Sequence, residues 1–389
     1  MPARDFIHRR TFPGTTGNIF DVVLHAAAIV EGLPAFVFLL ILIGLAGLPA
    51  LSFSLLLFLF CLSDWILLAA LPRARKSFGP AKPPTLLLAV MRLPFALLPS
   101  PFGLLAQLTG TALVIYGFWI EPHRLGLTRQ ALRSTKLKPG TPLRLLHIGD
   151  LHVERLTDRE RRLIELTRSA APDLILFSGD FLNLSYLRDP QAWEAAHAVL
   201  RELTAVVSPP LGVFAVTGSP AVDLPDVVPQ LLDGLPNLRW LRDEKVTLEH
   251  GGNTFDIVGV SCTHKPFEDE PRLLSILSPL PSLDERQAGG EGRFTVLLYH
   301  SPDLAPEAAQ AGIDLQLSGH THGGQVRLPL YGALVTGSLY GKRYEVGRIR
   351  VGKMTLSVTR GIGMEGKGAP RVRFLCPPEI TLWEITSQT

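Results

Sequence analysis

The sequence predicts an α/β fold on two sheets, preceded by N-terminal apolar helices. Short apolar runs bounded by turn residues alternate with amphipathic stretches after residue 142, as buried strands alternate with helices. Long runs with almost no charge fill residues 34–120, which is typical of membrane-spanning helices. Four of the later runs end beside an aspartate or a histidine, so the α/β region is where we expect a functional site.

Charge separates the two regions of the chain. Residues 1–120 contain four acidic and eight basic side chains, whereas the remaining 269 residues contain 31 acidic and 30 basic ones. The sequence shows no basic stripe with interleaved aromatic residues, so we expect no nucleic-acid partner. The three cysteines, Cys61, Cys262 and Cys376, make no disulfide framework, and we expect them to be small apolar fillers.

The apolar region predicts a membrane domain over residues 1–120 with three to four transmembrane helices. Residues 34–71 are almost wholly apolar, and since one span needs about 20 residues, we expect a hairpin of two helices there. Residues 102–120 are long enough for a further span. Residues 85–99 are short and contain Arg92, so three alternatives stay open: they cross the membrane, re-enter it, or lie in its interface.

The orientation of this domain depends on the short run. Basic residues flank the expected hairpin and place both its ends in the cytosol by the positive-inside rule. These residues are Arg4, Arg9, Arg10, Arg73, Arg75 and Lys76. If residues 85–99 cross, the α/β domain is cytosolic, and if they do not, it lies outside. We expect a basic linker over residues 121–142, and its charges favour the cytosolic side.

The α/β domain is expected over residues 143–389. Its first part alternates strands with helices, which predicts parallel pairing. The strands are expected at 143–148, 174–178, 212–217, 255–260, 295–298 and 314–317, with helices at 158–170 and 191–206. Its last part has strands without helices between them, at 344–351, 354–358 and 380–385. We therefore expect two sheets, the second of which closes with antiparallel strands.

The candidate site is a set of carboxylates and imidazoles that follow these strands. His320 and His322 lie in a glycine-bounded turn, and a backbone that bends this tightly lets two imidazoles converge on one point. A His-x-His pair arises by chance in a chain with 11 histidines, but here further residues of the same kind end other strands. These are Asp150, His152, Asp180 and His300. Since sites in α/β sheets form at the carboxyl ends of strands, the pattern indicates a metal site.

The motifs carry a family resemblance over residues 143–385. Asp150-Leu-His152, Gly179-Asp180, Tyr299-His300 and Gly319-His-Thr-His-Gly-Gly324 occur in the order and approximate spacing of the calcineurin-like metallophosphoesterases. With the closing runs at 359–363 and 377–382, the chain resembles the membrane-attached bacterial members. The resemblance implies a four-layer αββα fold and a metal-dependent hydrolase of phosphoesters in the bacterial cell membrane.

The resemblance also implies two divalent ions of the Mn, Fe or Zn type. One ion would be held by Asp150, His152 and His322, and the other by His300 and His320, with Asp180 between them. Two such ions clamp the oxygens of an in-line displacement at phosphorus and turn a bridging water into hydroxide. The expected substrates are phosphodiesters or pyrophosphates of small molecules or of lipids at the bilayer surface.

One motif departs from the family. Gly218-Ser219-Pro220-Ala221 stands where the family has Gly-Asn-His, whose Asn binds the second ion and whose His assists the leaving group. Ser219 is a weaker ligand, and Pro220 offers nothing, although general-acid help is typically worth about 10² to 10⁴ in rate. The alternatives are a catalytically weakened metal-binding member with a weakened second site, or a membrane scaffold or binding protein. The sequence does not determine the oligomeric state.

Two further side chains are weaker candidates. His264 follows the expected strand at 255–260 and is a possible substitute for the missing histidine, with an exposed loop histidine as the simpler interpretation. Arg155 follows His152 and has the planar fork that suits a substrate phosphate, with a solvated arginine at a helix start as the simpler interpretation.

Overall fold

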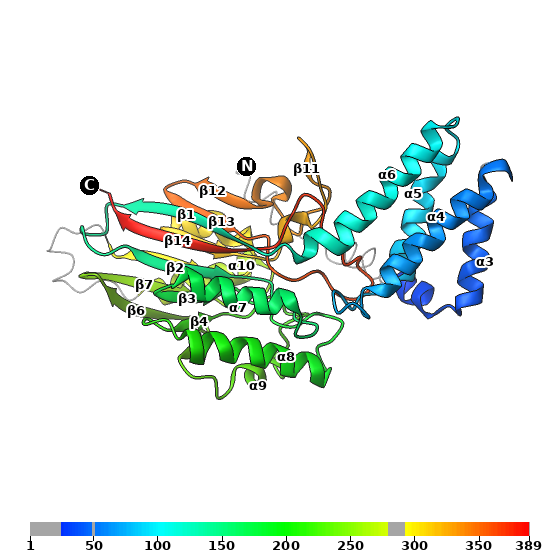
Figure 1. Ribbon diagram of the computed structural model, residues 1–389. Helices are drawn as coiled ribbons and strands as arrows, with labels where there is room; N and C mark the ends of the chain where they lie inside the picture. Colours follow the sequence, from blue (N-terminus) through cyan, green and yellow to red (C-terminus); the bar gives the residue numbers. More distant parts are fainter. Residues whose placement is uncertain (1–24, 49–50, 279–291, 389) are drawn as a thin grey trace. The chain divides into compact units, whose positions relative to one another are not determined.

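The computed structural model describes residues 25–48, 51–278 and 292–388 (Figure 1). The chain divides into two compact units. The helical unit comprises Met1–His123 and Glu365–Phe374, and the sheet unit comprises Arg124–Met364 and Leu375–Thr389. The arginines expected to precede the first span, Arg4, Arg9 and Arg10, lie outside the described residues.

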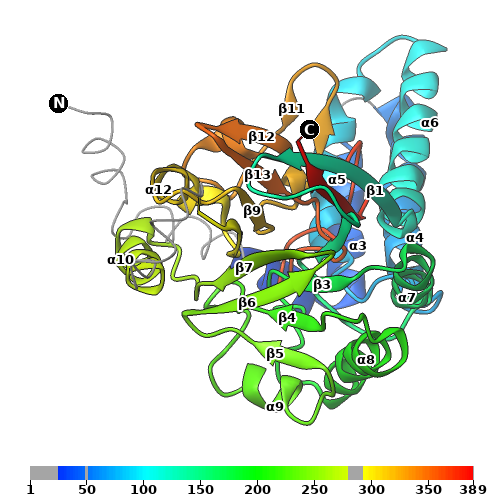
Figure 2. The same cartoon turned by 90° about the vertical axis from the view of Figure 1, so that its left-hand side faces the viewer.

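The sheet unit is built on two six-stranded mixed sheets (Figure 2). In spatial order the first sheet contains β1 (Gly126–Ser134), β14 (Glu379–Ser387), β2 (Leu143–Ile148), β3 (Leu174–Phe177), β4 (Val213–Ala215) and β5 (Leu238–Trp240). The second contains β12 (Gly347–Val351), β13 (Met354–Val358), β9 (Leu315–Ser318), β8 (Phe294–Leu298), β7 (Asn253–Gly259) and β6 (Glu244–His250). A small ribbon pairs β10 (Arg327–Leu328) with β11 (Gly332–Ala333).

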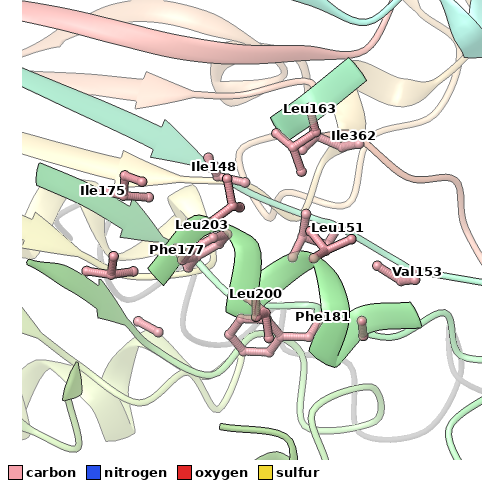
Figure 3. Close-up of a cluster of buried hydrophobic side chains, with 14 of the residues drawn as sticks. Ile148, Leu151, Val153, Leu163, Ile175, Phe177, Phe181, Leu200, Leu203 and Ile362 are labelled. Atoms are coloured by element: carbon pink, nitrogen blue, oxygen red, sulfur yellow. The ribbon is translucent and has the colours of Figure 1, made fainter. Parts of the chain in front are cut away.

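Side chains on the two faces of a strand belong to different hydrophobic cores, and these cores separate the layers of the fold. In β2, Leu145 belongs to the core between the sheets, whereas Leu146 and Ile148 belong to the core under the helices. Helices α7 (Asp158–Ala170), α8 (Pro190–Arg201) and α9 (Val228–Leu232) contribute to the latter core, part of which Figure 3 shows. Helices α10 (Pro266–Leu277) and α12 (Ala305–Gln310) contribute to a third core with the second sheet. Two mixed sheets with helices are what the sequence predicts.

The position of β14 corrects one expectation. The second sheet does end on an antiparallel pair, β12 and β13, but β14 joins the first sheet between β1 and β2. Its alternation explains why: Ile380 and Leu382 are buried in the core under the helices, and Trp383 and Ile385 in the core between the sheets. A strand that is apolar on both faces requires a covered, interior position.

The stretch expected to be a basic linker, residues 121–142, contains β1, which pairs in parallel with β14 along nine residues. This strand lies at the edge of its sheet, and edge strands commonly carry exposed charged side chains such as Arg129. Because of these charges, the segment lacks the short apolar run by which the other strands were predicted. Strands β5 and β6 were not expected either.

Within its described residues the helical unit contains a helix at 25–32, followed by α3 (Ala35–Ala46), α4 (Leu51–Ala70), α5 (Lys82–Ala96) and α6 (Phe102–Ile115). Segments 53–70 and 102–123 are long and apolar enough to cross a membrane. A pair of helices at 25–32 and 35–46, bent by 108°, is a further candidate if it counts as one broken span. Within the described residues, length and composition thus support two spans, or three if the bent pair is one span. The expected three to four spans stay a prediction.

Helix α5 carries Arg92 into the interior of the helical unit. The guanidinium binds both carboxylate oxygens of Asp64 in α4, at 2.7 and 2.8 Å. It also donates to the backbone and side-chain oxygens of Gln107 and to the hydroxyl of Thr111 in α6. All five of its N–H positions therefore face partners on two other helices, which explains how an apolar unit accommodates a charge.

Candidate dinuclear metal centre

The structure brings all six residues expected as metal ligands into one cluster. They lie in the loops that follow β2, β3, β8 and β9, at the carboxyl ends of these parallel strands. The Nε2 atoms of His152 and His322 are 3.1 Å apart, although 170 residues separate them in the chain. An Asp180 carboxylate oxygen lies 3.4 Å from Nε2 of His152 and 3.4 Å from Nε2 of His300. Asp180 thus lies between imidazoles from different loops.

The backbone at these positions is strained. Five of the six residues have a positive φ, between 41° and 68°: Asp150, His152, Asp180, His320 and His322. Such conformations are uncommon for residues other than glycine and gather at functional sites, where the surrounding structure holds them. At Gly179, whose φ is +96°, a Cβ would also collide with the backbone nitrogen of Gly218. This glycine permits the close approach of the loops that follow β3 and β4.

The donor atoms form overlapping groups, each of which fits a metal ion. Within each group the donor atoms lie within 4.8 Å of one another, so small side-chain movements would reach metal–ligand bonds of about 2.0–2.2 Å. Asp150, His152 and His322 make one group, and Asp150, Asp180 and His300 make another. A third group comprises His264, His300 and His320. This mixture of imidazole and carboxylate donors suits Mn, Fe or Zn.

Hydrogen bonds orient two of the imidazoles. Nδ1 of His300 lies 2.8 Å from the backbone oxygen of Ser178, so the Nδ1–H donates there and the lone pair is on Nε2. Nε2 of His320 lies 3.2 Å from the backbone oxygen of Gly337, which leaves the lone pair on Nδ1. Burial lowers the pKa of His320 to about 3 and that of His300 well below its usual value. Both rings are therefore neutral near pH 7, as metal ligands must be.

Ser219 lies at the edge of the cluster. Its hydroxyl oxygen is 3.1 Å from Nε2 of His300 and 3.3 Å from an oxygen of Asp180, and its backbone N–H donates to Asp180 at 2.6 Å. The motif that departs from the family thus still positions Asp180. Its neighbour Pro220 has no side-chain donor for a leaving group.

The structure places only one of the two weaker candidates, His264 and Arg155, beside the cluster. His264 lies beside the cluster, with its ring centroid 4.3 Å from that of His320. Arg155 binds the carboxylate of Asp189 at 2.9 Å and lies over the ring of Tyr186. This side chain is thereby engaged at the start of α8, and its expected contact with a substrate stays a prediction.

Asp223 was not among the residues predicted from the sequence, yet its buried carboxylate joins two loops of the site. It accepts hydrogen bonds from the backbone N–H groups of Gly218 (2.7 Å), Asp180 (2.8 Å) and Phe181 (3.1 Å). Burial raises the pKa of Asp223 to about 6, whereas these three donors lower it. The only signal in the sequence is an aspartate between apolar residues, Val222 and Leu224, in a loop without a regular pattern.

Comparison with known proteins identifies the family. Residues 143–324 match the family model of calcineurin-like phosphoesterases. The chain is 30% identical over 296 residues to YkuE of Bacillus subtilis, an uncharacterized metallophosphoesterase, with 74% of this chain and 95% of YkuE covered. The chain belongs to the calcineurin-like phosphoesterases. It is thus a metallophosphoesterase of the hydrolase class, and this prediction from the sequence is confirmed.

Two further relatives have named activities. The phosphodiesterase YaeI of Escherichia coli is 25% identical over 279 residues, which cover 69% of this phosphoesterase and 92% of YaeI. The UDP-2,3-diacylglucosamine pyrophosphatase LpxG of Chlamydia muridarum is 26% identical over 314 residues, with 69% of this phosphoesterase and 91% of LpxG covered. The relatives therefore include enzymes for both phosphodiester and pyrophosphate bonds.

Proposed function

We propose that this phosphoesterase is anchored in the bacterial cell membrane and hydrolyses phosphodiester or pyrophosphate bonds, with lipid-linked molecules as substrates. The observation that carries the proposal is the position of Asp180, which lies 3.4 Å from an imidazole on each side, His152 and His300. A carboxylate placed in this way is suited to bridge two ions. When bound, two divalent ions supply Lewis-acid charge to both oxygens of the displacement and activate water.

The six donor side chains would bind the two ions in two groups. Asp150, His152 and His322 form one donor group and would hold the first ion. His300 and His320 belong to another group and would hold the second, with Asp180 shared. The chain itself orients these donors: the backbone N–H of His320 donates to Asp150 at 2.9 Å, and Ser178 fixes the tautomer of His300. The residues of the site thus bind and orient, and no side-chain nucleophile is required.

The leaving group is the basis for preferring diesters and pyrophosphates. Pro220 cannot donate a proton, and a nucleotide or a phosphate leaves without one more readily than an alkoxide does. A lipid-linked substrate is supported by segments 53–70 and 102–123, which are long and apolar enough to anchor the protein in a bilayer. The name of LpxG, a relative that acts on a diacylated nucleotide sugar, supports it further.

The first test uses the full-length protein in detergent with Mn²⁺ and an activated aryl phosphodiester. We expect Asp180→Ala to lower kcat/KM by at least about 100-fold, since the loss of an outer-shell partner alone lowers metal-site activity by about 10- to 100-fold. The matched control is Asp226→Ala, because Asp226 is an exposed aspartate that pairs with Arg188. Wild-type turnover no better than that of Asp180→Ala would reject the proposal.

The second test concerns the substrate and uses the same preparation. We expect kcat/KM to be higher for a diacylated nucleoside-diphosphate sugar in mixed micelles than for its deacylated form. We also expect an aryl diester to react more than about 100-fold faster than an alkyl diester, the size of a missing general acid. Equal kcat/KM values for the diacylated and the deacylated substrate would exclude a lipid-linked substrate. The proposed phosphodiesterase activity would be unaffected by that result.

The weakened metal-binding protein is the second candidate function, and Pro220 is the observation that favours it. It predicts bound metal without turnover of any of these substrates. A membrane scaffold predicts no stoichiometric transition metal, so metal content per chain and turnover together separate the three functions. The side of the membrane is a separate part of the proposal. The basic residues of 121–142, just after segment 102–123, favour a cytosolic sheet unit, and this orientation requires residues 85–99 to cross the membrane. Resistance of that unit to protease added to intact spheroplasts would support this orientation.

A further inference from the structure

A seventh donor residue, His264, faces the expected second ion. It lies between β7 and α10, and its ligand-type nitrogen is within 4.8 Å of those of His300 and His320. The ring centroid of His264 is 4.3 Å from that of His320 and 5.9 Å from that of His300. Its φ of 59° is in the same left-handed region as that of five of the six expected ligands. His264 is thus a half-buried member of the cluster and not an exposed loop histidine.

The three imidazoles of His264, His300 and His320 are arranged so that they could bind one cation. The tautomers described above leave lone pairs on Nε2 of His300 and on Nδ1 of His320. On His264, Nδ1 lies 3.8 Å from the sulfur of Cys262, so Nε2 is the atom that remains for an ion. Converging lone pairs repel one another unless an electrophile lies among them.

One carboxylate fixes the loop of His264 relative to the strand of His300. Asp269, which is fully buried in α10, accepts hydrogen bonds from the backbone N–H of Thr263 at 3.0 Å and from its hydroxyl at 2.9 Å. The same carboxylate accepts a hydrogen bond from the hydroxyl of Tyr299 at 2.6 Å. Thr263 and Tyr299 directly precede His264 and His300 in the chain. The two imidazoles are therefore held in place by a shared partner, as ligands of a preorganised site are.

We infer that His264 is a protein ligand of the second ion and takes the place left by the asparagine that the family motif would supply at Ser219. This inference rests on the dinuclear centre of the proposed function. The second site then has three imidazoles and Asp180, whereas the first has two imidazoles and two carboxylates. Because nitrogen donors favour Zn and Fe over Mn, the second site prefers Zn or Fe, and the first accepts Mn more readily.

The test measures metal binding to the full-length protein in detergent, by elemental analysis after gel filtration and by calorimetric titration with Zn²⁺. We expect two ions per wild-type chain and one tightly bound ion in His264→Ala. Loss of an outer-shell partner typically lowers metal affinity by about 10- to 100-fold. Loss of a direct ligand should lower the affinity for the second Zn²⁺ by at least this much. The matched control His197→Ala removes an imidazole from α8, and we expect it to keep both ions.

Two further variants keep the inference falsifiable. His264→Asn supplies an amide oxygen, so we expect the second ion to return with a preference shifted from Zn²⁺ toward Mn²⁺. Ser219→Ala should retain two ions if His264 and not Ser219 completes the site. Equal thermal unfolding of wild type and His264→Ala in a chelator shows that the fold is intact. If both bind two ions with equal affinity, the inference is overturned; if the wild type binds fewer than two, the proposed centre fails as well.

Discussion

The carboxylate of Asp223 accepts a hydrogen bond from the backbone N–H of Asp180 at 2.8 Å. The residue expected to bridge two ions is thus held by a second carboxylate 43 positions later in the chain. Asp223 also binds the N–H groups of Gly218 and Phe181, so it determines how closely the loops after β3 and β4 approach. The geometry of the metal centre depends on this buried carboxylate, because it holds the backbone on both sides of the gap between these loops.

Asp223→Asn should weaken metal binding without removing a ligand. An amide retains one acceptor oxygen, and its NH₂ group would face a backbone N–H donor, a mismatch of about 1–3 kcal/mol. We expect metal affinity to fall by about 10- to 100-fold, the effect typical of an outer-shell partner. Calorimetric titration and thermal unfolding measure the two effects. Asp233→Asn, an exposed aspartate after α9, is the control, and equal affinities in both variants would contradict the role of Asp223.

Gly179→Ala should disrupt the centre more than an equally strained substitution elsewhere. Gly179 and Gly312 have φ values of +96° and +85°, so both alanines carry the backbone strain of about 1–3 kcal/mol. Only at Gly179 would the added Cβ meet the backbone of Gly218, whereas nothing lies within 4 Å at Gly312. We expect Gly179→Ala to lose bound metal and Gly312→Ala to retain it, as measured by metal content. Equal retention would show that the loops after β3 and β4 can separate harmlessly.

Metal affinity of the second site should depend weakly on pH between 5.5 and 7.5. The pKa values of His264 and His320 are lowered to about 3 and that of His300 lies well below its usual value, so no proton competes there. Three imidazoles with an ordinary pKa of about 6.5 would together lose about 10³-fold in affinity over this range. We expect less than about tenfold in a Zn²⁺ titration. A loss near the larger figure would mean that these rings are protonated in the metal-free protein.

Removal of Arg92 should destabilise the helical unit by about 3–5 kcal/mol, because Asp64 would be left buried without its partner. We expect Arg92→Met to lower the unfolding temperature in detergent and the double variant Asp64→Leu/Arg92→Met to recover most of the loss. The control Arg73→Met alters an exposed arginine. If the single and double variants were equally unstable, the packing of the arginine stem, and not the ion pair, would carry the effect.

Much of the candidate site could be predicted from the sequence because its signals are local. Asp150, Asp180 and His300 each follow a short apolar run, and a run of that kind ends where a parallel strand ends. Strand ends of one sheet meet at one edge, so Asp150 and Asp180 can be assigned to one place. The loop of His300 reaches the same place from the second sheet. The positions of His264 and Asp223 could not be predicted in this way, since each lies in an irregular loop whose course depends on partners elsewhere in the fold.

The sequence by itself determined most of the strands, the apolar helices, the family and six candidate donor residues, because periodicity, composition and short motifs each act over a few residues. The tertiary structure alone decided the place of β14 in the first sheet, the pairing of Arg92 with Asp64 and the approach of His264 to His320. Each of these contacts joins segments that are distant in the chain, and no local sequence pattern indicates that the two segments meet. Their association is selected by burial and by satisfaction of buried charge over the whole fold.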